Sequence, residues 1–335
     1  MRERRLTIAV FNEASGWALS GSLVERLRES APSGVSVQPV KTRGELIEAL
    51  PETDYLVGFP LTEGQFAEFG GNVKWIQLTG TSGESLAPLR SAMERGVRVS
   101  SAGSIRAPQT AEHAIALILA LRRQLHVSMR AQVEHNWAAG EVAPKIRDLE
   151  SATVGLLAMD AIGEEIAHRV KAFGCEVVAL SDDPEGKFLH VDRMLGLAQL
   201  DEFMRRSDVV VVATPFGTPG LSALGKRELS MMSPHAILVD VSRGGVVKHG
   251  ELVELLRRGV IAGAGLDVFE HEPLAPESPL WSMGNVIVTP HVASASPRYW
   301  DRAVDVVRRN VARIEQGKGL LDEVLLERVG EMALK

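Results

Sequence analysis

The sequence predicts an α/β protein built from two doubly wound parallel sheets. Short runs of apolar and β-branched residues alternate with helical patterns along the chain. Strands of this kind suit a sheet that helices cover on both faces, because each crossover helix buries the strands beneath it. The length of 335 residues favours two compact units over one. The expected strands are Leu6–Phe11, Val35–Val40, Tyr55–Phe59, Trp75–Leu78, Val97–Ser100, Val154–Ala158, Val177–Leu180, Val209–Ala213, Ile237–Asp240 and Val286–Thr289.

Two segments in the middle of the chain indicate how it is organised. Residues 111–121 are apolar nearly all round, so we expect a helix buried on several sides, either between domains or at a subunit contact. Burial in a core would also explain this composition. Residues 136–151 are polar and irregular, and a new strand follows them, so we expect a structural unit to restart near Thr153.

Composition excludes several classes of protein. Hydrophobic residues make up 45% of the chain and charged residues 24%, as in ordinary globular proteins. The formal net charge is -6 without a basic cluster, so we expect no nucleic-acid partner. The longest apolar candidate, Ala114–Leu121, is far shorter than the roughly 20 residues of a spanning helix, so we expect no membrane partner. The single cysteine, Cys175, favours a cytoplasmic location.

The strand that begins at Val154 leads through a tight turn into a helix, the arrangement in which a G-x-G-x-x-G loop binds a dinucleotide. The three glycine positions hold Ala158, Asp160 and Gly163. Asp160 puts a carboxylate where the helix N-terminus would hold a phosphate. Two unit charges 4 Å apart repel by roughly 4 kcal/mol at an effective dielectric constant of 20, equivalent to several hundredfold in affinity.

One interpretation of Asp160 is an N-cap that satisfies the first N–H groups of the helix. This interpretation does not exclude a weakly held cofactor, because a shift of the loop or a rotation of the carboxylate would still admit one. In that case the loop residues assigned to the cofactor are Met159, Asp160, Ala161 and Ile162.

The next strand ends in Ser181, Asp182 and Asp183, roughly 20 residues beyond the loop, where an acid accepts hydrogen bonds from an adenosine ribose. We assign Ser181 and Asp182 to this position, and Asp183 would serve equally. An acidic strand end repels a 2′-phosphate, so NAD(H) is favoured over NADP. A solvated turn is the alternative interpretation.

Three segments that follow strands supply a guanidinium, a carboxylate and an imidazole, from Arg243, Glu272 and His291. Ligands of open parallel sheets bind at these strand ends. Reduction of a 2-keto acid needs such a set: a fork for the carboxylate, a proton donor for the carbonyl oxygen, and an acid that balances the charge of the donor. The other histidines show no metal-ligand spacing, so we expect no metal site.

The run from Thr153 through Pro297 resembles the D-isomer-specific 2-hydroxyacid dehydrogenase family, and the resemblance covers most of the chain after Tyr55. Ser296–Trp300 resembles the glyoxylate/hydroxypyruvate reductase-like branch of that family. The motifs that stand in the family's order are Arg106–His113, Ser242–Gly245, Asp267–Phe269, Glu272–Leu274 and Thr289–His291.

The resemblance implies roles for these residues. His291 would donate and accept the proton, Glu272 would be its partner, and Arg243 would clamp the substrate. NAD(H) and a small 2-keto or D-2-hydroxy acid would be the reactants. A main-chain cradle for the substrate carboxylate is implied at Gly80, Thr81, Ser82 and Gly83. Positions that flank the cofactor in the family are Thr214, Pro215, Val241, Ser242 and Asp267.

The resemblance also implies two domains of Rossmann or flavodoxin type. Residues 1–102 and 292–335 would form a discontinuous substrate domain, and residues 103–291 an NAD(P)-binding domain inserted into it. A homodimer through the helix at 111–121 and the segment after it is implied likewise. The alternative is a member that has lost hydride transfer and acts as a ligand-binding or regulatory protein, which Asp160 favours. An enzyme that uses the three residues on another substrate has no positive support in the sequence.

Overall fold

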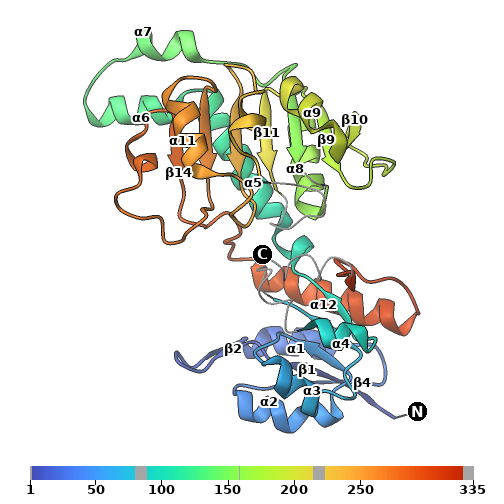
Figure 1. Ribbon diagram of the computed structural model, residues 1–335. Helices are drawn as coiled ribbons and strands as arrows, with labels where there is room; N and C mark the ends of the chain where they lie inside the picture. The colour runs from blue at the N-terminus through green and yellow to red at the C-terminus, as the bar shows by residue number, and fades with distance from the viewer. Residues whose placement is uncertain (1, 80–88, 158, 214–222, 327–335) are drawn as a thin grey trace. The chain divides into compact units, whose positions relative to one another are not determined.

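The computed structural model describes residues 2–79, 89–157, 159–213 and 223–326 of the chain, and it forms two compact units (Figure 1). One unit comprises residues 1–106 and 296–335, and the other comprises residues 107–295. Each unit contains a parallel sheet flanked by helices, so the predicted fold class is confirmed. The second unit is continuous in sequence, and it interrupts the first.

The first unit has a parallel sheet whose described strands follow the order β4-β1-β5-β6-β7. Its core contains Leu6, Tyr55 and Trp75, and the helix near the C-terminus packs Val304 and Val307 against them. Its elements are β1 (Arg4–Ile8), β2 (Phe11–Asn12), β3 (Trp17–Ala18), α1 (Gly21–Ser30), β4 (Val35–Pro39), α2 (Arg43–Ala49), η1 (Leu50–Glu52), β5 (Tyr55–Val57), α3 (Glu63–Phe69), β6 (Trp75–Gln77), α4 (Arg90–Glu94), β7 (Arg98–Ser100) and α12 (Tyr299–Glu315).

The second unit has a parallel sheet in the order β10-β9-β8-β11-β12-β13-β14. The chain moves outward from β8 to β10 and then returns to the other side of β8 at β11. Loops at the carboxyl ends of β8 and β11 therefore diverge, which makes this edge the binding edge of the sheet. The strands are β8 (Thr153–Leu157), β9 (Glu176–Ser181), β10 (Arg193–Gly196), β11 (Val209–Val212), β12 (Ile237–Asp240), β13 (Gly263–Leu266) and β14 (Val286–Val288).

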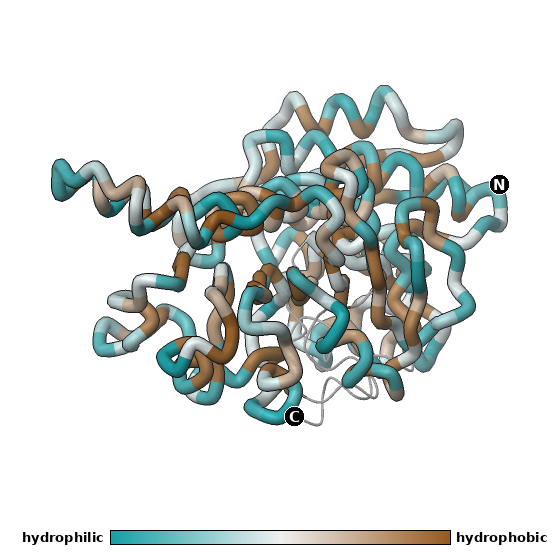
Figure 2. Tube along the Cα trace, turned by 90° about the horizontal axis from the view of Figure 1, so that it is seen from above, coloured by the Kyte–Doolittle hydropathy of each residue, from teal (hydrophilic) through white to brown (hydrophobic). Residues whose placement is uncertain are grey.

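Several helices of the second unit bury an apolar face. In Figure 2 brown, hydrophobic residues recur along helical segments that are otherwise teal or pale. The long helix α5 (Gly103–Arg122), predicted from residues 111–121, buries Ala111, Ala114 and Ile118 in the core beside β8. Core packing therefore accounts for its composition. The others are α6 (Leu125–Val133), α7 (Ala139–Val142), η4 (Ala143–Lys145), α8 (Ala161–Lys171), η5 (Leu197–Gln199), α9 (Leu200–Arg206), α10 (Lys226–Leu229), α11 (His249–Arg257) and η6 (Pro279–Ser282). Of these, α8, α9 and α11 bury an apolar face, whereas the short α7 and η4 bury no residue.

The short strands β10 and β13 and the small β2–β3 hairpin are absent from our predicted set. In β13 the reason is glycine. A Cβ atom added at Gly265 would lie 3.1 Å from the Cβ of Leu117 on α5, and one at Gly263 would lie 2.7 Å from the carbonyl oxygen of Asn285. Close packing of α5 on the sheet requires these glycines, and they hide the apolar signal of a strand.

Candidate active site

The three predicted catalytic residues follow three adjacent strands. Arg243 comes shortly after β12, Glu272 lies in the turn after β13, and His291 follows β14. The register pairs Asp240 with Leu266 and Leu266 with Val288, so the ends of these strands lie side by side. The three loops therefore begin side by side, at the carboxyl ends of β12, β13 and β14.

His291 and Glu272 are brought into direct contact. Nδ1 of His291 lies 2.6 Å from Oε2 of Glu272, and the other carboxylate oxygen accepts a hydrogen bond from the backbone N–H of Phe269 at 2.9 Å. Their side chains are 44% and 33% exposed, respectively, so the pair lies at the surface of its unit. Because Nδ1 is engaged, Nε2 is the ring nitrogen that can face a substrate.

Arg243 lies on the neighbouring loop and is partly buried. The next residue, Gly244, has a φ angle of 80°. A Cβ atom there would lie 2.5 Å from the carbonyl oxygen of Phe269. Only glycine fits this backbone contact, so the loop of Arg243 rests directly on the turn that carries Glu272.

Asp267 organises the loop of His291. Its buried carboxylate accepts hydrogen bonds from the backbone N–H groups of Val292 and Ala293 at 3.0 and 2.9 Å. The hydroxyl of Thr289 donates to the same carboxylate at 2.6 Å. His113 on α5 lies 2.9 Å from that hydroxyl through Nε2. Asp267 is also one of the predicted cofactor-flanking positions.

Asp240 ends β12 beneath the loop of Arg243 and is fully buried. Its Oδ1 accepts a hydrogen bond from the backbone N–H of Ser242 at 3.0 Å. Its Oδ2 has no hydrogen-bond partner within the described part of the chain. Burial raises the pKa of Asp240 to about 6, and the charge of Asp267 adds to the effect, whereas Ser242 opposes it.

The loop after β8 holds Asp160 at the N-cap position of α8. Its Oδ1 accepts hydrogen bonds from the backbone N–H groups of Ile162 and Gly163 at 2.9 and 3.0 Å. The N-cap interpretation is confirmed, and the N–H groups that would bind phosphate already have an acceptor. Met159 and Ala161 are partly buried beside the core.

At the end of β9 the hydroxyl of Ser181 donates to Asp182 at 3.3 Å and accepts from the backbone N–H of Asp183 at 3.1 Å. Both acids are exposed. Because β9 pairs directly with β8, this acidic end lies beside the loop of Asp160.

Several predicted residues lie outside the described residues. These are Gly80, Thr81, Ser82, Gly83, Ala158, Thr214 and Pro215. Thr79, directly before the predicted cradle, accepts a hydrogen bond from the hydroxyl of Tyr299 at 2.7 Å through its carbonyl oxygen.

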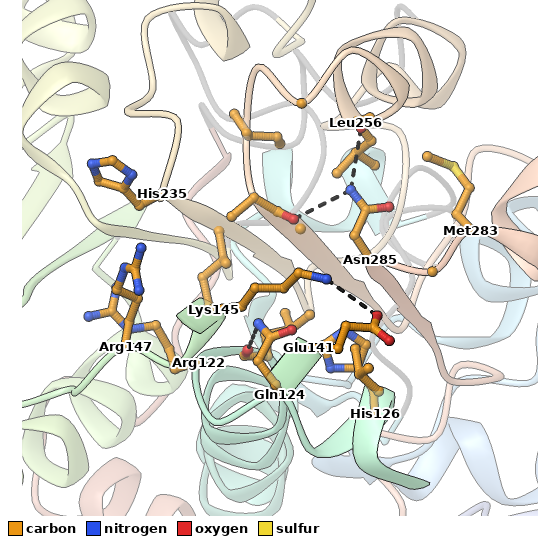
Figure 3. Close-up of a pocket in the computed structure, with 18 of the residues that line it drawn as sticks. Arg122, Gln124, His126, Glu141, Lys145, Arg147, His235, Leu256, Met283 and Asn285 are labelled. Carbon is orange, nitrogen blue, oxygen red and sulfur yellow. Dashed lines mark hydrogen bonds and ion pairs between the residues drawn. The ribbon is translucent and has the colours of Figure 1, made fainter. Parts of the chain in front are cut away.

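A large cavity lies at the opposite edge of the second sheet (Figure 3). It has a volume of about 900 Å³, and its lining includes Ile237 and Gly263, which begin β12 and β13. Arg122, Lys145 and Arg147 also line it. Its place at the amino ends of the strands separates it from Arg243, Glu272 and His291, which follow the carboxyl ends.

Two kinds of site are not found in the part of the chain that the structure describes. No group of three or more His, Cys, Asp or Glu side chains there is arranged to hold a metal ion. None of the helices in those residues is long and apolar enough to cross a membrane.

Comparisons with known proteins identify the family. Residues 115–293 match the profile described as "D-isomer specific 2-hydroxyacid dehydrogenase, NAD binding domain". The glyoxylate reductase of Pyrococcus furiosus is 31% identical over 285 residues, which cover 82% of this chain and 83% of that protein. The chain belongs to the D-isomer-specific 2-hydroxyacid dehydrogenase family. The predicted family is therefore confirmed.

Other members agree. The D-3-phosphoglycerate dehydrogenase of Archaeoglobus fulgidus is 31% identical over 268 residues, which are 78% of this chain and 49% of that longer protein. The solved structure of a D-isomer-specific 2-hydroxyacid dehydrogenase from Xanthobacter autotrophicus Py2, with NADPH and MES, matches with a TM-score of 0.79 and 28% identity. That match covers 98% of this chain and 100% of the other. The family is one of oxidoreductases, so the chain is a dehydrogenase, and the non-enzymatic alternative is not favoured.

Asp240 gives a pH-dependent prediction. A buried carboxyl whose pKa is raised from 3.8 to about 6 destabilises the fold increasingly as the pH rises between these values. Asp240→Asn should therefore stabilise the protein more at pH 8 than at pH 5, by up to about 3 kcal/mol at pH 8. Urea unfolding at both pH values measures this. An equal change in unfolding free energy at both pH values would contradict it.

Proposed function

We propose that the protein interconverts a small 2-keto acid and the corresponding D-2-hydroxy acid, with His291, Glu272 and Arg243 as its catalytic residues. The contact of 2.6 Å between His291 and Glu272 carries this proposal. A carboxylate on one ring nitrogen leaves the other free to exchange a proton with a substrate oxygen. Arg243, on the neighbouring loop, supplies the positive charge that a carboxylate substrate needs.

Each residue has a defined part in the reduction. The imidazolium of His291 gives the proton on Nε2 to the carbonyl oxygen of the substrate, which becomes the hydroxyl. Glu272 holds the ring in place and balances its positive charge. Arg243 binds the substrate carboxylate with two parallel N–H groups. Carbon 2 of the substrate would receive a hydride from NAD(H) when the cofactor is bound.

The cofactor contacts that we propose fit most of this edge of the sheet. Three segments lie at the carboxyl ends of the strands of this sheet. They are the first turn of α8, which follows β8, the acidic end of β9, and the segment after β12. The acids after Ser181 favour NAD(H) over NADP. Asp160 fits less well, because its carboxylate occupies two N–H groups of the helix end. The proposed contact residues are Met159, Asp160, Ala161, Ile162, Ser181, Asp182, Thr214, Pro215, Val241, Ser242 and Asp267.

The proposed catalytic roles give different kinetic signatures. His291→Asn should lower kcat by about 10²–10⁴-fold, because the proton donor is lost. Arg243→Lys should mainly raise the KM of the keto acid, since an ammonium cannot make the planar paired contact. Initial rates with glyoxylate, hydroxypyruvate and pyruvate give kcat and KM for each variant. His271→Ala, an exposed histidine beside Glu272, is the control that should change neither constant. Wild-type kcat in His291→Asn would exclude the assignment.

The proposed effect of Asp160 is electrostatic. Asp160→Asn keeps an oxygen that can cap α8 but removes the charge, so NADH should bind about tenfold or more tightly. Fluorescence titration with NADH and NADPH measures this. Glu277→Gln removes one charge from an exposed position of the same unit and serves as the control. Equal dissociation constants for Asp160→Asn and wild type would show that the carboxylate does not oppose the nucleotide.

We also propose a cytoplasmic homodimer. The single cysteine, Cys175, is free and buried, which suits a reducing compartment. On α6, Leu125, Met129 and Val133 form an apolar row with spacing of four residues, and they are 49%, 67% and 80% exposed. Exposed apolar rows of this kind mark contact surfaces. We assign this row to a second copy of the chain.

Charged side chains introduced into the apolar row of α6 test the dimer proposal. Met129→Asp together with Val133→Asp should convert the dimer into a folded monomer, because two carboxylates cannot be buried without partners. Light scattering after size exclusion gives the mass. Leu189→Asp, at a residue that is 91% exposed elsewhere in the same unit, should leave the mass unchanged. A wild-type monomer would refute the proposal.

A further inference from the structure

The start of α11 lacks a cap from its own N-cap residue. Lys248 makes no side-chain capping hydrogen bond. Instead, Oε2 of Glu270 accepts a hydrogen bond from the backbone N–H of His249 at 2.9 Å. A carboxylate from the turn after β13 thus caps α11, where the positive end of the helix dipole favours it.

The contact is reciprocal. The backbone N–H of Glu270 donates to Nδ1 of His249 at 3.3 Å, and the imidazole lies 5.5 Å from the ring of Phe269 between centroids. Nδ1 is therefore unprotonated, and the neutral ring carries its proton on Nε2. Burial lowers the pKa of His249, which favours this neutral form, although the charges of Glu270 and Glu272 oppose the shift.

The two segments joined here carry the catalytic residues. His249 lies six residues after Arg243, and Glu270 lies two residues before Glu272. Between these points, Gly244 touches the backbone of Phe269. The Arg243 loop and the Glu272 turn are thus held together at Gly244 and at the His249–Glu270 pair.

We propose that His249 is a positioning residue for the reaction. With Glu270 it holds the Arg243 loop against the Glu272 turn. This contact, which we call the clamp, lets the guanidinium and the His291–Glu272 pair contact the same substrate molecule. The clamp touches neither substrate nor cofactor. Its kinetic consequence rests on the proposed function, whereas its effect on the Glu272–His291 contact does not.

The buried Nε2 of His249 distinguishes positioning from stabilisation. It makes no hydrogen bond to any residue that the structure describes. Leucine at this position removes the unsatisfied Nε2, which offsets part of the cost of leaving the backbone N–H of Glu270 without its acceptor. His249→Leu should therefore unfold at nearly the wild-type temperature while its site is loosened. His249→Asn keeps an acceptor near the Nδ1 position and is the conservative variant.

The kinetic experiment compares these variants. His249→Leu and Glu270→Ala should each lower kcat/KM for the keto acid by about tenfold or more, because small misplacements of catalytic groups are costly. His249→Asn should restore most of this loss. His271→Ala on the same turn is the control, and NADH affinity should stay unchanged in all four. Glu270→Ala breaks the clamp by changing a side chain that is 40% exposed, so this variant should fold. It therefore tests the proposal even if His249→Leu fails to fold.

A spectroscopic readout does not depend on turnover. The Nδ1 proton of His291, hydrogen-bonded to Glu272, should give a far-downfield ¹H signal in protein with ¹⁵N-labelled histidine, and His291→Asn assigns it. The signal should shift or vanish in His249→Leu and Glu270→Ala and persist in His249→Asn. If the wild type shows this signal but no turnover, the proposed function is wrong. The signal in the His249 and Glu270 variants then still tests the clamp. An unchanged signal and unchanged kcat/KM in both disrupting variants would overturn the clamp.

Discussion

The buried carboxylate of Asp267 is the interaction on which the candidate site depends. It is 1% exposed, and its oxygens accept hydrogen bonds from Thr289, Val292 and Ala293. A buried charge is tolerated only when it is satisfied in this way. The carbonyl oxygen of the same residue accepts from the backbone N–H of His291 at 2.9 Å. These bonds hold His291 at a φ of 53°, a left-handed conformation that is uncommon for residues other than glycine.

The site arises from strand register rather than from closeness in sequence. Because β12, β13 and β14 are adjacent and parallel, their loops meet at one edge, and each loop rests on its neighbour. Gly244 lies against Phe269, Glu270 caps α11, and Glu272 reaches His291. Such mutual support would place the proposed catalytic groups before a substrate arrives, so that little reorganisation is left for the reaction.

Much of the fold could be predicted from the sequence, and so could the segments that carry the site residues. Apolar strands such as Val209–Val212 are visible because both faces of the sheet are covered, and Arg243 and His291 follow such strands. Glu272 follows β13, whose two glycines hide the apolar pattern, so only its own motif indicates it. Contacts between loops could not be predicted. Nothing in the local sequence shows that Glu270 caps α11 or that His249 accepts its N–H, because these contacts depend on the register of separate strands. The residue type of Asp160 and its place before α8 indicate an N-cap, and the hydrogen bonds from Ile162 and Gly163 confirm it.

We propose that this edge of the sheet supports hydride transfer although Asp160 caps α8. Isotope transfer tests it most directly. The purified protein is incubated with glyoxylate or hydroxypyruvate and with NADH or NADPH that carries deuterium at nicotinamide C4. We expect deuterium at carbon 2 of the 2-hydroxy acid product, detected by mass spectrometry. Folded protein that forms no deuterated product with either cofactor would contradict it.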